Sequence, residues 1–233
     1  MTSSLKELAL KHKTDKEGSH FYTRWYEKHL GHLRNEPIRL LEIGVGGYEN
    51  TLAGGESLRM WKEFFPNAKI FGLDIHDKSS LAEERIQLLQ GSQNDAYFLR
   101  SIGKKHGPFD VVVDDGSHIN SDVIASFLNL FPYVTKTGIY IIEDLQTSYW
   151  RNFGGSSKAG APNTSMGFLK QLTDGLNHAE FDFIDYKPSL LETEIECISF
   201  VHNMAFVFKG ENTESSNFIP PHPRSQFVMG GDS

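Results

Sequence analysis

The chain alternates short runs of β-branched and aromatic residues with longer stretches whose apolar residues recur every three or four positions. The short runs predict buried strands, and the recurring pattern predicts amphipathic helices. The predicted strands span residues 38–45, 69–75, 86–90, 109–113, 138–143, 196–201 and 204–208. The predicted helices span residues 5–13, 21–33, 58–65, 94–105, 121–131 and 166–176, with one short helix after residue 75. A further short apolar run occupies residues 181–184.

This order of elements predicts an α/β fold. Five strand–helix alternations indicate βαβ units, and therefore a mostly parallel sheet covered by helices on both faces. Only His202 and Asn203 separate the last two strands, which predicts an antiparallel hairpin. A seven-stranded, mostly parallel sheet with one antiparallel strand resembles the Rossmann-like fold of class I methyltransferases. We expect residues 1–35 to be helices of the same domain, residues 36–210 to form the S-adenosylmethionine-binding catalytic domain, and residues 211–233 to be a polar tail.

Composition and charge exclude several classes of protein. No apolar run approaches the ~18 residues that a membrane span needs, and the N-terminus lacks the features of a secretory signal, so a cytoplasmic location is expected. A net charge of −7 argues against nucleic-acid binding, which needs clustered Lys and Arg. The basic segment 10–16 fits a solvated helix end about as well as an anion contact. Cys197 stands in an apolar run and is expected to be a small buried side chain.

A glycine-rich turn follows the first predicted strand. Glycines at such a turn let the backbone approach a ligand closely and expose its amides. A dinucleotide-binding fingerprint would need glycine where Glu49 stands, and no Walker lysine follows. Glu42, two residues before the first glycine, suits a ligand with a positive charge better than a pyrophosphate. The turn resembles the first motif of S-adenosylmethionine-dependent methyltransferases, although an ordinary tight turn explains such a motif about as well.

Polar residues also follow the next two predicted strands. Asp74 stands where an acid can accept hydrogen bonds from ribose hydroxyls, as in other nucleotide-binding α/β folds. The segment 91–95 offers short polar groups that could read an adenine edge. An S-adenosylmethionine site is therefore predicted from residues at successive strand ends, namely Glu42, Gly44, Gly46, Asp74, Ser92, Gln93 and Asp114.

Two pairs of acids end the fourth and fifth predicted strands. One pair includes Asp115, and the other, one strand–helix unit later, is Glu143 and Asp144. We expect these three acids to converge, because parallel strand ends meet at one edge of the sheet. Converging carboxylates must be paired, protonated or bound to a cation. Three acids without a nearby cysteine indicate a hard metal, with Mg²⁺ favoured over Ca²⁺ or Mn²⁺. The alternative is that these acids only cap helices and line a polar rim.

His118 lies three residues beyond Asp115 and is delivered to the same rim. A neutral imidazole near a metal-bound hydroxyl can take its proton, so His118 is a candidate general base, although most histidines are structural or solvent-exposed. The polar segment after Asp144 is a candidate acceptor surface. Gln146, Tyr149 and the neighbouring Trp150 could contact a sugar, but an aromatic pair after a strand is as often packing.

Several motifs together resemble those of the metal-dependent sugar O-methyltransferases of antibiotic biosynthesis. The matching segments are Thr14-Asp-Lys16 with Tyr22, Leu41-Glu-Ile-Gly-Val-Gly-Gly47, Asp114-Asp-Gly-Ser-His118, Ile142-Glu-Asp144 and Thr147-Ser-Tyr-Trp150. The resemblance implies that Asp115, Glu143 and Asp144 bind Mg²⁺ and that His118 is the base. It also implies a vicinal diol of a deoxysugar as the chelating acceptor and a homo-oligomeric assembly. Two other functions stay open, a cephalosporin-hydroxylase-like oxidoreductase and a non-catalytic binding module.

Overall fold

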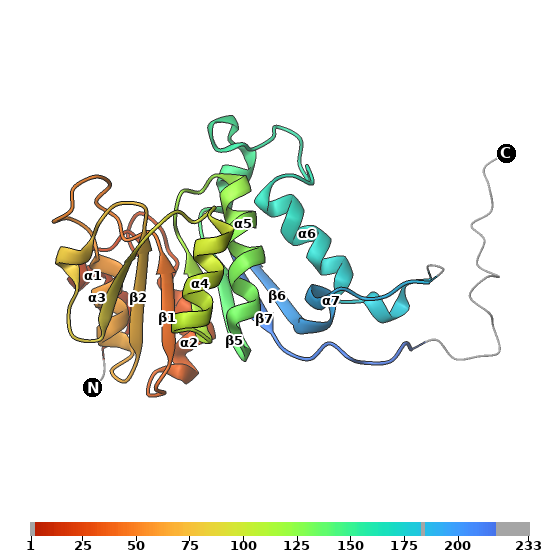
Figure 1. Ribbon diagram of the computed structural model, residues 1–233, viewed down its shortest axis with the longest axis horizontal. Coiled ribbons are helices and arrows are strands. Elements are labelled where there is room, and N and C mark those ends of the chain that lie inside the picture. Colours follow the sequence, from red (N-terminus) through yellow and green to blue (C-terminus); the bar gives the residue numbers. More distant parts are fainter. Residues whose placement is uncertain (1–2, 183–184, 218–233) are drawn as a thin grey trace.

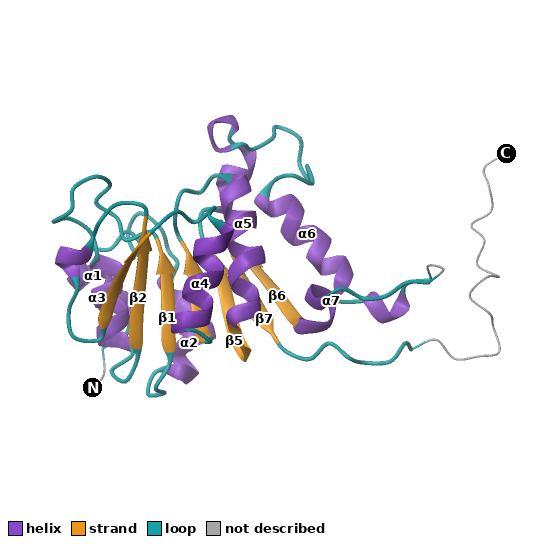
Figure 2. Ribbon diagram, in the orientation of Figure 1, coloured by secondary structure: helices purple, strands orange, loops and turns teal. Residues whose placement is uncertain are grey.

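Seven strands form one sheet through the centre of the molecule, with helices on both of its faces (Figures 1 and 2). This computed structural model describes residues 3–182 and 185–217. The strands are β1 (Arg39–Ile43), β2 (Lys69–Asp74), β3 (Ile86–Gln90), β4 (Phe109–Asp114), β5 (Val134–Ile142), β6 (Ile195–Val201) and β7 (Met204–Lys209). Each of them contains or overlaps one of the predicted strands.

The strands lie in the order β3-β2-β1-β4-β5-β7-β6. The pairs from β3 through to β5 are all parallel, whereas β7 runs antiparallel to both β5 and β6. β7 is therefore the single reversed strand. The predicted mostly parallel sheet with a terminal hairpin is confirmed, and the turn of that hairpin places Asn203 at a positive φ of 61°.

The helices divide into two layers because successive strand residues point to opposite faces of the sheet. The helices are α1 (Leu5–His12), α2 (Thr23–Leu30), α3 (Glu56–Phe64), α4 (Ala96–His106), α5 (Asn120–Leu130), α6 (Ser165–Gly175) and α7 (Leu190–Glu194). Apolar residues of α1, α2 and α3 pack with Val111 and Val113 on one face of β4. Those of α4, α5 and α6 pack with Val112 on the other face. Figure 1 draws α4, α5 and α6 in front of the sheet.

Capping side chains define where several helices begin. Ser4 and Glu7 form a reciprocal capping box at α1. The Asp95 carboxylate accepts hydrogen bonds from the backbone amides of Tyr97 and Phe98 and so starts α4. Thr164 accepts from the Gly167 amide at the start of α6. These residues explain why α1, α4 and α6 start within two positions of the starts that the hydrophobic pattern predicts.

The register of the central strands brings their ends together. Ile43 pairs with Asp114, and Asp114 pairs with Ile142. The residues that follow these positions, Gly44, Asp115 and Glu143, therefore emerge side by side at the carboxyl edge of the sheet. This is the predicted convergence.

Some predicted details were wrong. A 3₁₀ turn, Ser79–Leu81, stands where a short helix was expected after β2. The segment after Asp144 is more ordered than a loop, because it contains 3₁₀ turns at Leu145–Tyr149 and Arg151–Phe153. Cys197 is exposed, since β6 is the edge strand of the sheet.

Two predictions fall partly outside the described residues. Phe181 and the residue after it lie in no strand, and the rest of the run 181–184 is not described. The described residues end at 217, within the predicted polar tail. None of the helices in the described ranges combines the length and the apolar character required to cross a membrane.

Candidate functional site

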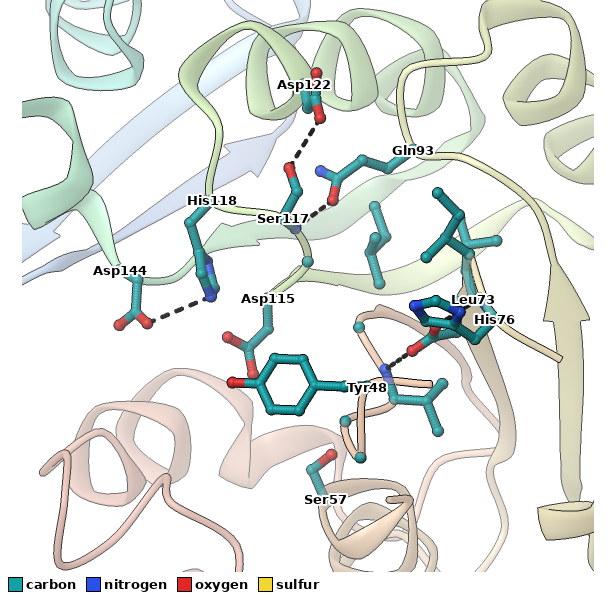
Figure 3. Close-up of a pocket in the computed structure, with 18 of the residues that line it drawn as sticks. Tyr48, Ser57, Leu73, His76, Gln93, Asp115, Ser117, His118, Asp122 and Asp144 are labelled. Atoms are coloured by element: carbon teal, nitrogen blue, oxygen red, sulfur yellow. Dashed lines mark hydrogen bonds and ion pairs between the residues drawn. The ribbon is translucent and has the colours of Figure 1, made fainter. Parts of the chain in front are cut away.

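A cavity of about 680 Å³ opens at the carboxyl ends of β1, β2, β3 and β4. Ligands of open α/β sheets bind at this edge, and the volume is in the usual range for small-molecule pockets. Five segments of the chain line it, namely residues 13–15, 43–48, 73–76, 91–93 and 115–118, together with Glu56, Ser57, Asp122, Asp144 and Phe153. Figure 3 shows how side chains from these segments point into the cavity.

The glycine turn after β1 forms one wall of this cavity. Gly44 has a φ of 92°, and a Cβ at this position would lie 2.1 Å from the backbone oxygen of Asp115. Only glycine therefore allows β1 and β4 to end this close together. Asp74 closes the turn from the β2 side, because its carboxylate accepts hydrogen bonds from the amides of Val45 at 3.0 Å and His76 at 2.9 Å. Gly44, Gly46 and Asp74 all line the cavity, as the prediction of a ligand site requires.

Gln93 braces the end of β3 against the end of β4. Its side-chain oxygen accepts a hydrogen bond from the Ser117 amide at 2.6 Å, and its side-chain nitrogen donates to Asp114 at 3.2 Å. The Ser117 hydroxyl donates to Asp122 of α5 at 2.9 Å (Figure 3). Gln93 and the neighbouring Ser92 line the cavity, as predicted. Through this bond to Ser117, the side-chain amide of Gln93 also fixes the turn that carries His118.

Asp114 lies beneath the cavity and is not among its lining residues. Its carboxylate accepts hydrogen bonds from Ser126, from Tyr140 at 3.2 Å and from Gln93. Burial raises the pKa of Asp114 to about 6, although these donors and the nearby His118 oppose the shift. Asp114, which was predicted to contact the ligand, therefore supports the cavity wall from behind through its hydrogen bond with Gln93.

Glu42 also faces away from the cavity. It is fully buried, and its carboxylate accepts a hydrogen bond from the Trp61 indole at 2.9 Å. Its other oxygen lies 3.1 Å from the ammonium group of Lys16. Glu42, which was predicted to contact the ligand, is therefore not among the residues that line the cavity.

Lys16 is completely buried at the centre of a cluster of acids. Besides Glu42, its Nζ lies 2.8 Å from Asp115 Oδ2 and 2.6 Å from Glu143 Oε1. Tyr26 of α2 donates a further hydrogen bond to Glu143. Lys16, the last residue of the basic segment 10–16, is thus not exposed to solvent as a helix end would be. Its ion pairs join the N-terminal region to the carboxyl ends of β1, β4 and β5.

The electrostatics of this inner cluster are strongly perturbed. Burial alone would lower the pKa of the Lys16 amine, but the charges of Asp115, Glu143 and Glu42 outweigh it and raise that pKa well above its ordinary value. Burial and the charge of Asp115 raise the pKa of Glu143, and burial raises that of Glu42. Three acids share one lysine, so the cluster has an excess of negative charge when its carboxyl groups are ionised.

A second group of ligating side chains lies on the cavity side of Asp115. Asp115, His118 and Asp144 each offer a ligand atom, and these atoms lie within 4.8 Å of one another. His118 Nε2 is 3.6 Å from Asp144 Oδ2, and Figure 3 shows these two side chains facing each other. Carboxylate oxygens with an imidazole fit a divalent cation. The carboxylate of Glu143, the third predicted metal ligand, is instead turned inward to Lys16 and Tyr26.

The N-terminal segment completes the surroundings of Asp144. The Tyr22 hydroxyl donates to Asp144 Oδ1 at 2.7 Å, and His20, stacked on the Tyr22 ring, lies 3.8 Å from the same oxygen. Burial and Asp144 raise the pKa of Tyr22, so this phenol stays a donor. Asp144 and His118 both adopt left-handed backbone conformations, with φ of 53° and 56°. Such conformations cost about 1–3 kcal/mol in non-glycine residues and concentrate at functional sites.

The two residues predicted to contact an acceptor do not line the cavity. The side-chain oxygen of Gln146 is buried, and Tyr149 is half-exposed outside the cavity. The aromatic residues that line it include Tyr48 and Phe153, and the Phe153 ring centroid lies 6.5 Å from that of His118. Asn120 of α5 holds this turn through a 2.8 Å hydrogen bond to the Phe153 carbonyl.

Sequence reasoning did not assign roles to Lys16, Tyr26, Tyr48 or Phe153. Lys16 had a visible signal, since the Thr14-Asp-Lys16 motif stands outside the strand pattern. Tyr48 and Phe153 follow strand ends by several residues, and hydrophobic periodicity does not place such positions.

The chain is similar to known sugar O-methyltransferases, although no protein-family model matches it. It is 48% identical over 213 residues to mycinamicin VI 2″-O-methyltransferase of Micromonospora griseorubida, covering 90% of this chain and 53% of that protein. It is 44% identical to an 8-demethyl-8-(2-methoxy-alpha-L-rhamnosyl)-tetracenomycin-C 3′-O-methyltransferase of Streptomyces olivaceus, covering 91% and 55%. The chain thus spans about half the length of the curated relatives it matches.

The fold also matches solved structures. The structure of MycE methyltransferase in complex with Mg, SAH and mycinamycin VI superposes with a TM-score of 0.90 and 46% identity, covering 95% of this chain and 57% of that one. The seven-stranded sheet is accordingly that of class I O-methyltransferases. That MycE complex contains Mg and SAH.

Proposed function

We propose that this chain, a homologue of the sugar O-methyltransferases of macrolide and tetracenomycin biosynthesis, transfers a methyl group from S-adenosylmethionine to a sugar hydroxyl of a glycosylated natural product. One observation carries the proposal. A single cavity joins the glycine turn and Asp74 to the ligating group Asp115, His118 and Asp144. A methyl donor and an acceptor hydroxyl that bind these two parts would be neighbours.

The cofactor side is proposed to hold S-adenosylmethionine at the ends of β1, β2 and β3. Gly44 and Gly46 bring the backbone to the ligand, and Asp74 offers its carboxylate to the ribose. Ser92 and Gln93 border the adenine end. Glu42 and Asp114 support this wall from behind, because both are buried next to residues that line it. Their role is to fix the ends of β1 and β4.

The reaction side is proposed to hold Mg²⁺ and the acceptor. Mg²⁺ prefers oxygen ligands, so Asp115 and Asp144 would bind it and leave the imidazole of His118 available. Glu143 is the third candidate ligand, through the carboxylate that Lys16 and Tyr26 now orient. When bound, S-adenosylmethionine supplies an electrophilic sulfonium methyl group and Mg²⁺ lowers the pKa of the acceptor hydroxyl. His118 Nε2 takes the hydroxyl proton as the oxygen–methyl bond forms and the methyl–sulfur bond breaks.

The acceptor is proposed to be a small glycoside whose vicinal diol faces the ligating group. Phe153 lies next to His118 in the cavity, so it is placed to contact the sugar, whereas Gln146 and Tyr149 would contact parts of a larger acceptor outside it. Assembly as a homo-oligomer in the cytoplasm belongs to the same proposal. Sedimentation velocity of the purified chain tests the assembly, and a single monomeric species would contradict it.

Calorimetric titration with S-adenosylhomocysteine tests the central claim without knowledge of the acceptor. We expect saturable one-to-one binding that Asp74→Ala weakens by about tenfold or more, because the substitution removes both an acceptor for the ligand and the partner of the Val45 amide. Asp174→Ala, on the exposed side of α6, is the control and should leave the affinity unchanged. Failure of the wild-type chain to bind at millimolar ligand would contradict the proposal and favour the hydroxylase-like alternative.

The metal assignment is tested by titration of Mg²⁺ in the presence of S-adenosylhomocysteine. Asp144→Asn is expected to weaken Mg²⁺ binding by about tenfold or more, since it removes a charged oxygen ligand from the cavity. Glu143→Gln provides the comparison. An equal loss in both variants would make Glu143 a ligand, whereas a smaller loss in Glu143→Gln would restrict it to the inner cluster. Unchanged affinity in Asp144→Asn would remove Asp144 from the site.

A further inference from the structure

Lys78 is a buried lysine that serves no part of the site described so far. Only 2% of its surface is exposed, although it lies in the surface connection between β2 and β3. Its Nζ donates to three backbone carbonyls, those of Tyr48 at 2.7 Å, Asn50 at 2.8 Å and Ala53 at 3.1 Å. An ammonium group has three protons, so all of its donors are used.

The three carbonyls belong to one segment, residues 46–55, which we call the glycine loop. It connects β1 to α3 and folds back on itself through the Gly55 amide, which donates to the Val45 carbonyl at 2.7 Å. A Cβ at Gly54 would lie 2.5 Å from the carbonyl oxygens of both Val45 and Gly46, so this return is possible only with glycine. The carbonyls at the middle of the loop consequently converge on Lys78.

Little apolar burial holds the glycine loop in place. Tyr48 is 85% exposed and Leu52 is 77% exposed. Gly46, Gly47 and Tyr48 nevertheless line the cavity, and Figure 3 shows the Tyr48 ring among its side chains. Segments with few buried contacts open easily unless hydrogen bonds hold them. The position of this cavity wall therefore depends on hydrogen bonds to loop carbonyls. Lys78 donates three of them, the Ser80 hydroxyl donates to Thr51 at 2.6 Å, and the Arg59 guanidinium donates to Gly54 at 3.2 Å.

The end of β2 and the segment after it contact the glycine loop at its start and at its middle. Asp74 accepts the Val45 amide where the loop begins, and four residues later Lys78 binds its middle. Three carbonyls of the loop thus point to one buried ammonium group that is not part of the cavity lining. We propose that Lys78 is a positioning residue for the cofactor pocket, whose ammonium group holds the glycine loop in the conformation that binds S-adenosylmethionine. This inference rests on the proposed function for the identity of the ligand.

Lys78→Met tests the proposal, because methionine keeps an unbranched apolar chain and removes the donors. We expect the dissociation constant for S-adenosylhomocysteine, measured by calorimetry, to rise by about tenfold or more, the factor that corresponds to loss of one charge-assisted hydrogen bond. Amide hydrogen exchange of residues 46–55 should also become faster in the absence of ligand. Lys136→Met is the matched control, since it removes one charge from an exposed pair with Glu211 and should change neither measurement.

A second variant guards against misfolding of the first. Lys78→Arg keeps the charge, but a planar guanidinium cannot direct its donors at three converging carbonyls, so a rise of several-fold in the dissociation constant is expected. Wild-type affinity in a folded Lys78→Met or Lys78→Arg protein would overturn the proposal, as would unchanged hydrogen exchange in the loop. If the wild-type chain itself binds no S-adenosylhomocysteine, the proposed function fails, whereas the exchange measurement still tests the hold of Lys78 on the loop.

Discussion

Replacing Lys16 with methionine is expected to lower the free energy of unfolding by about 3–5 kcal/mol. The substitution leaves Glu42, Asp115 and Glu143 without the cation that lies within 3.1 Å of each of them. Removing one partner of a buried ion pair is costly because the remaining charge stays in a medium of low polarity. For a chain of this size, the expected decrease in melting temperature is roughly 6–20 °C. Urea denaturation and thermal melting followed by circular dichroism measure the effect.

An exposed lysine provides the control for this substitution. Lys11 pairs with Glu63 at 2.7 Å, but 60% of the Lys11 side chain is exposed. Lys11→Met should therefore change the stability by less than ~1 kcal/mol. Equal effects of the two substitutions would contradict the view that Lys16 is the essential counter-charge of the inner cluster. A Lys16→Met protein of normal stability would mean that the acids are protonated without it.

Replacing His118 with alanine is expected to slow methyl transfer by ~10²-fold or more while binding of S-adenosylhomocysteine is retained. The imidazole is the one nitrogen base that both lines the cavity and lies next to Asp144, among the residues that the structure describes. Its left-handed backbone conformation, enforced by the Gly116–Ser117 turn, directs it there. Single-turnover measurements with saturating glycoside and Mg²⁺ isolate the chemical step from binding.

His20 is the informative comparison, because it is the other imidazole near Asp144, at 3.8 Å. It stacks on Tyr22 and is not part of the cavity lining, so His20→Ala should slow the reaction less than ~10-fold. A larger effect at His20 than at His118 would reverse the assignment of the base. Loss of Mg²⁺ affinity in His118→Ala, in place of a slower chemical step, would make His118 a ligand.

The sequence predicted the sheet well because its central strands are buried on both faces and read as continuous apolar runs. The same pattern predicts where the strands end, and therefore the positions of Gly44, Asp74, Gln93 and Asp115. It does not predict the direction in which the side chain of a residue near a strand end points. Glu42 is the next-to-last residue of β1 and Asp115 directly follows β4, yet Glu42 packs beside Trp61 in the core whereas Asp115 reaches the cavity.

The contacts that could not be predicted join distant parts of the chain. Lys16 looked like one of several lysines at a helix end, because its carboxylate partners are separated from it by many elements. Lys78 occupies a polar surface connection, and nothing in its local sequence indicates that three carbonyls surround its amine. Periodicity reports which face of an element is buried, but a buried ion pair depends on how complete elements pack.

The inner cluster also has a consequence for the order in which the protein folds. Lys16 lies 99 residues before Asp115 and 127 residues before Glu143. Closing loops of that length is slow, because the chain loses conformational entropy before the contact contributes its favourable free energy. During synthesis the lysine leaves the ribosome long before β5 exists. The inner cluster therefore forms only after β5 has been synthesised and has joined the sheet, so the reactive edge is completed late in folding.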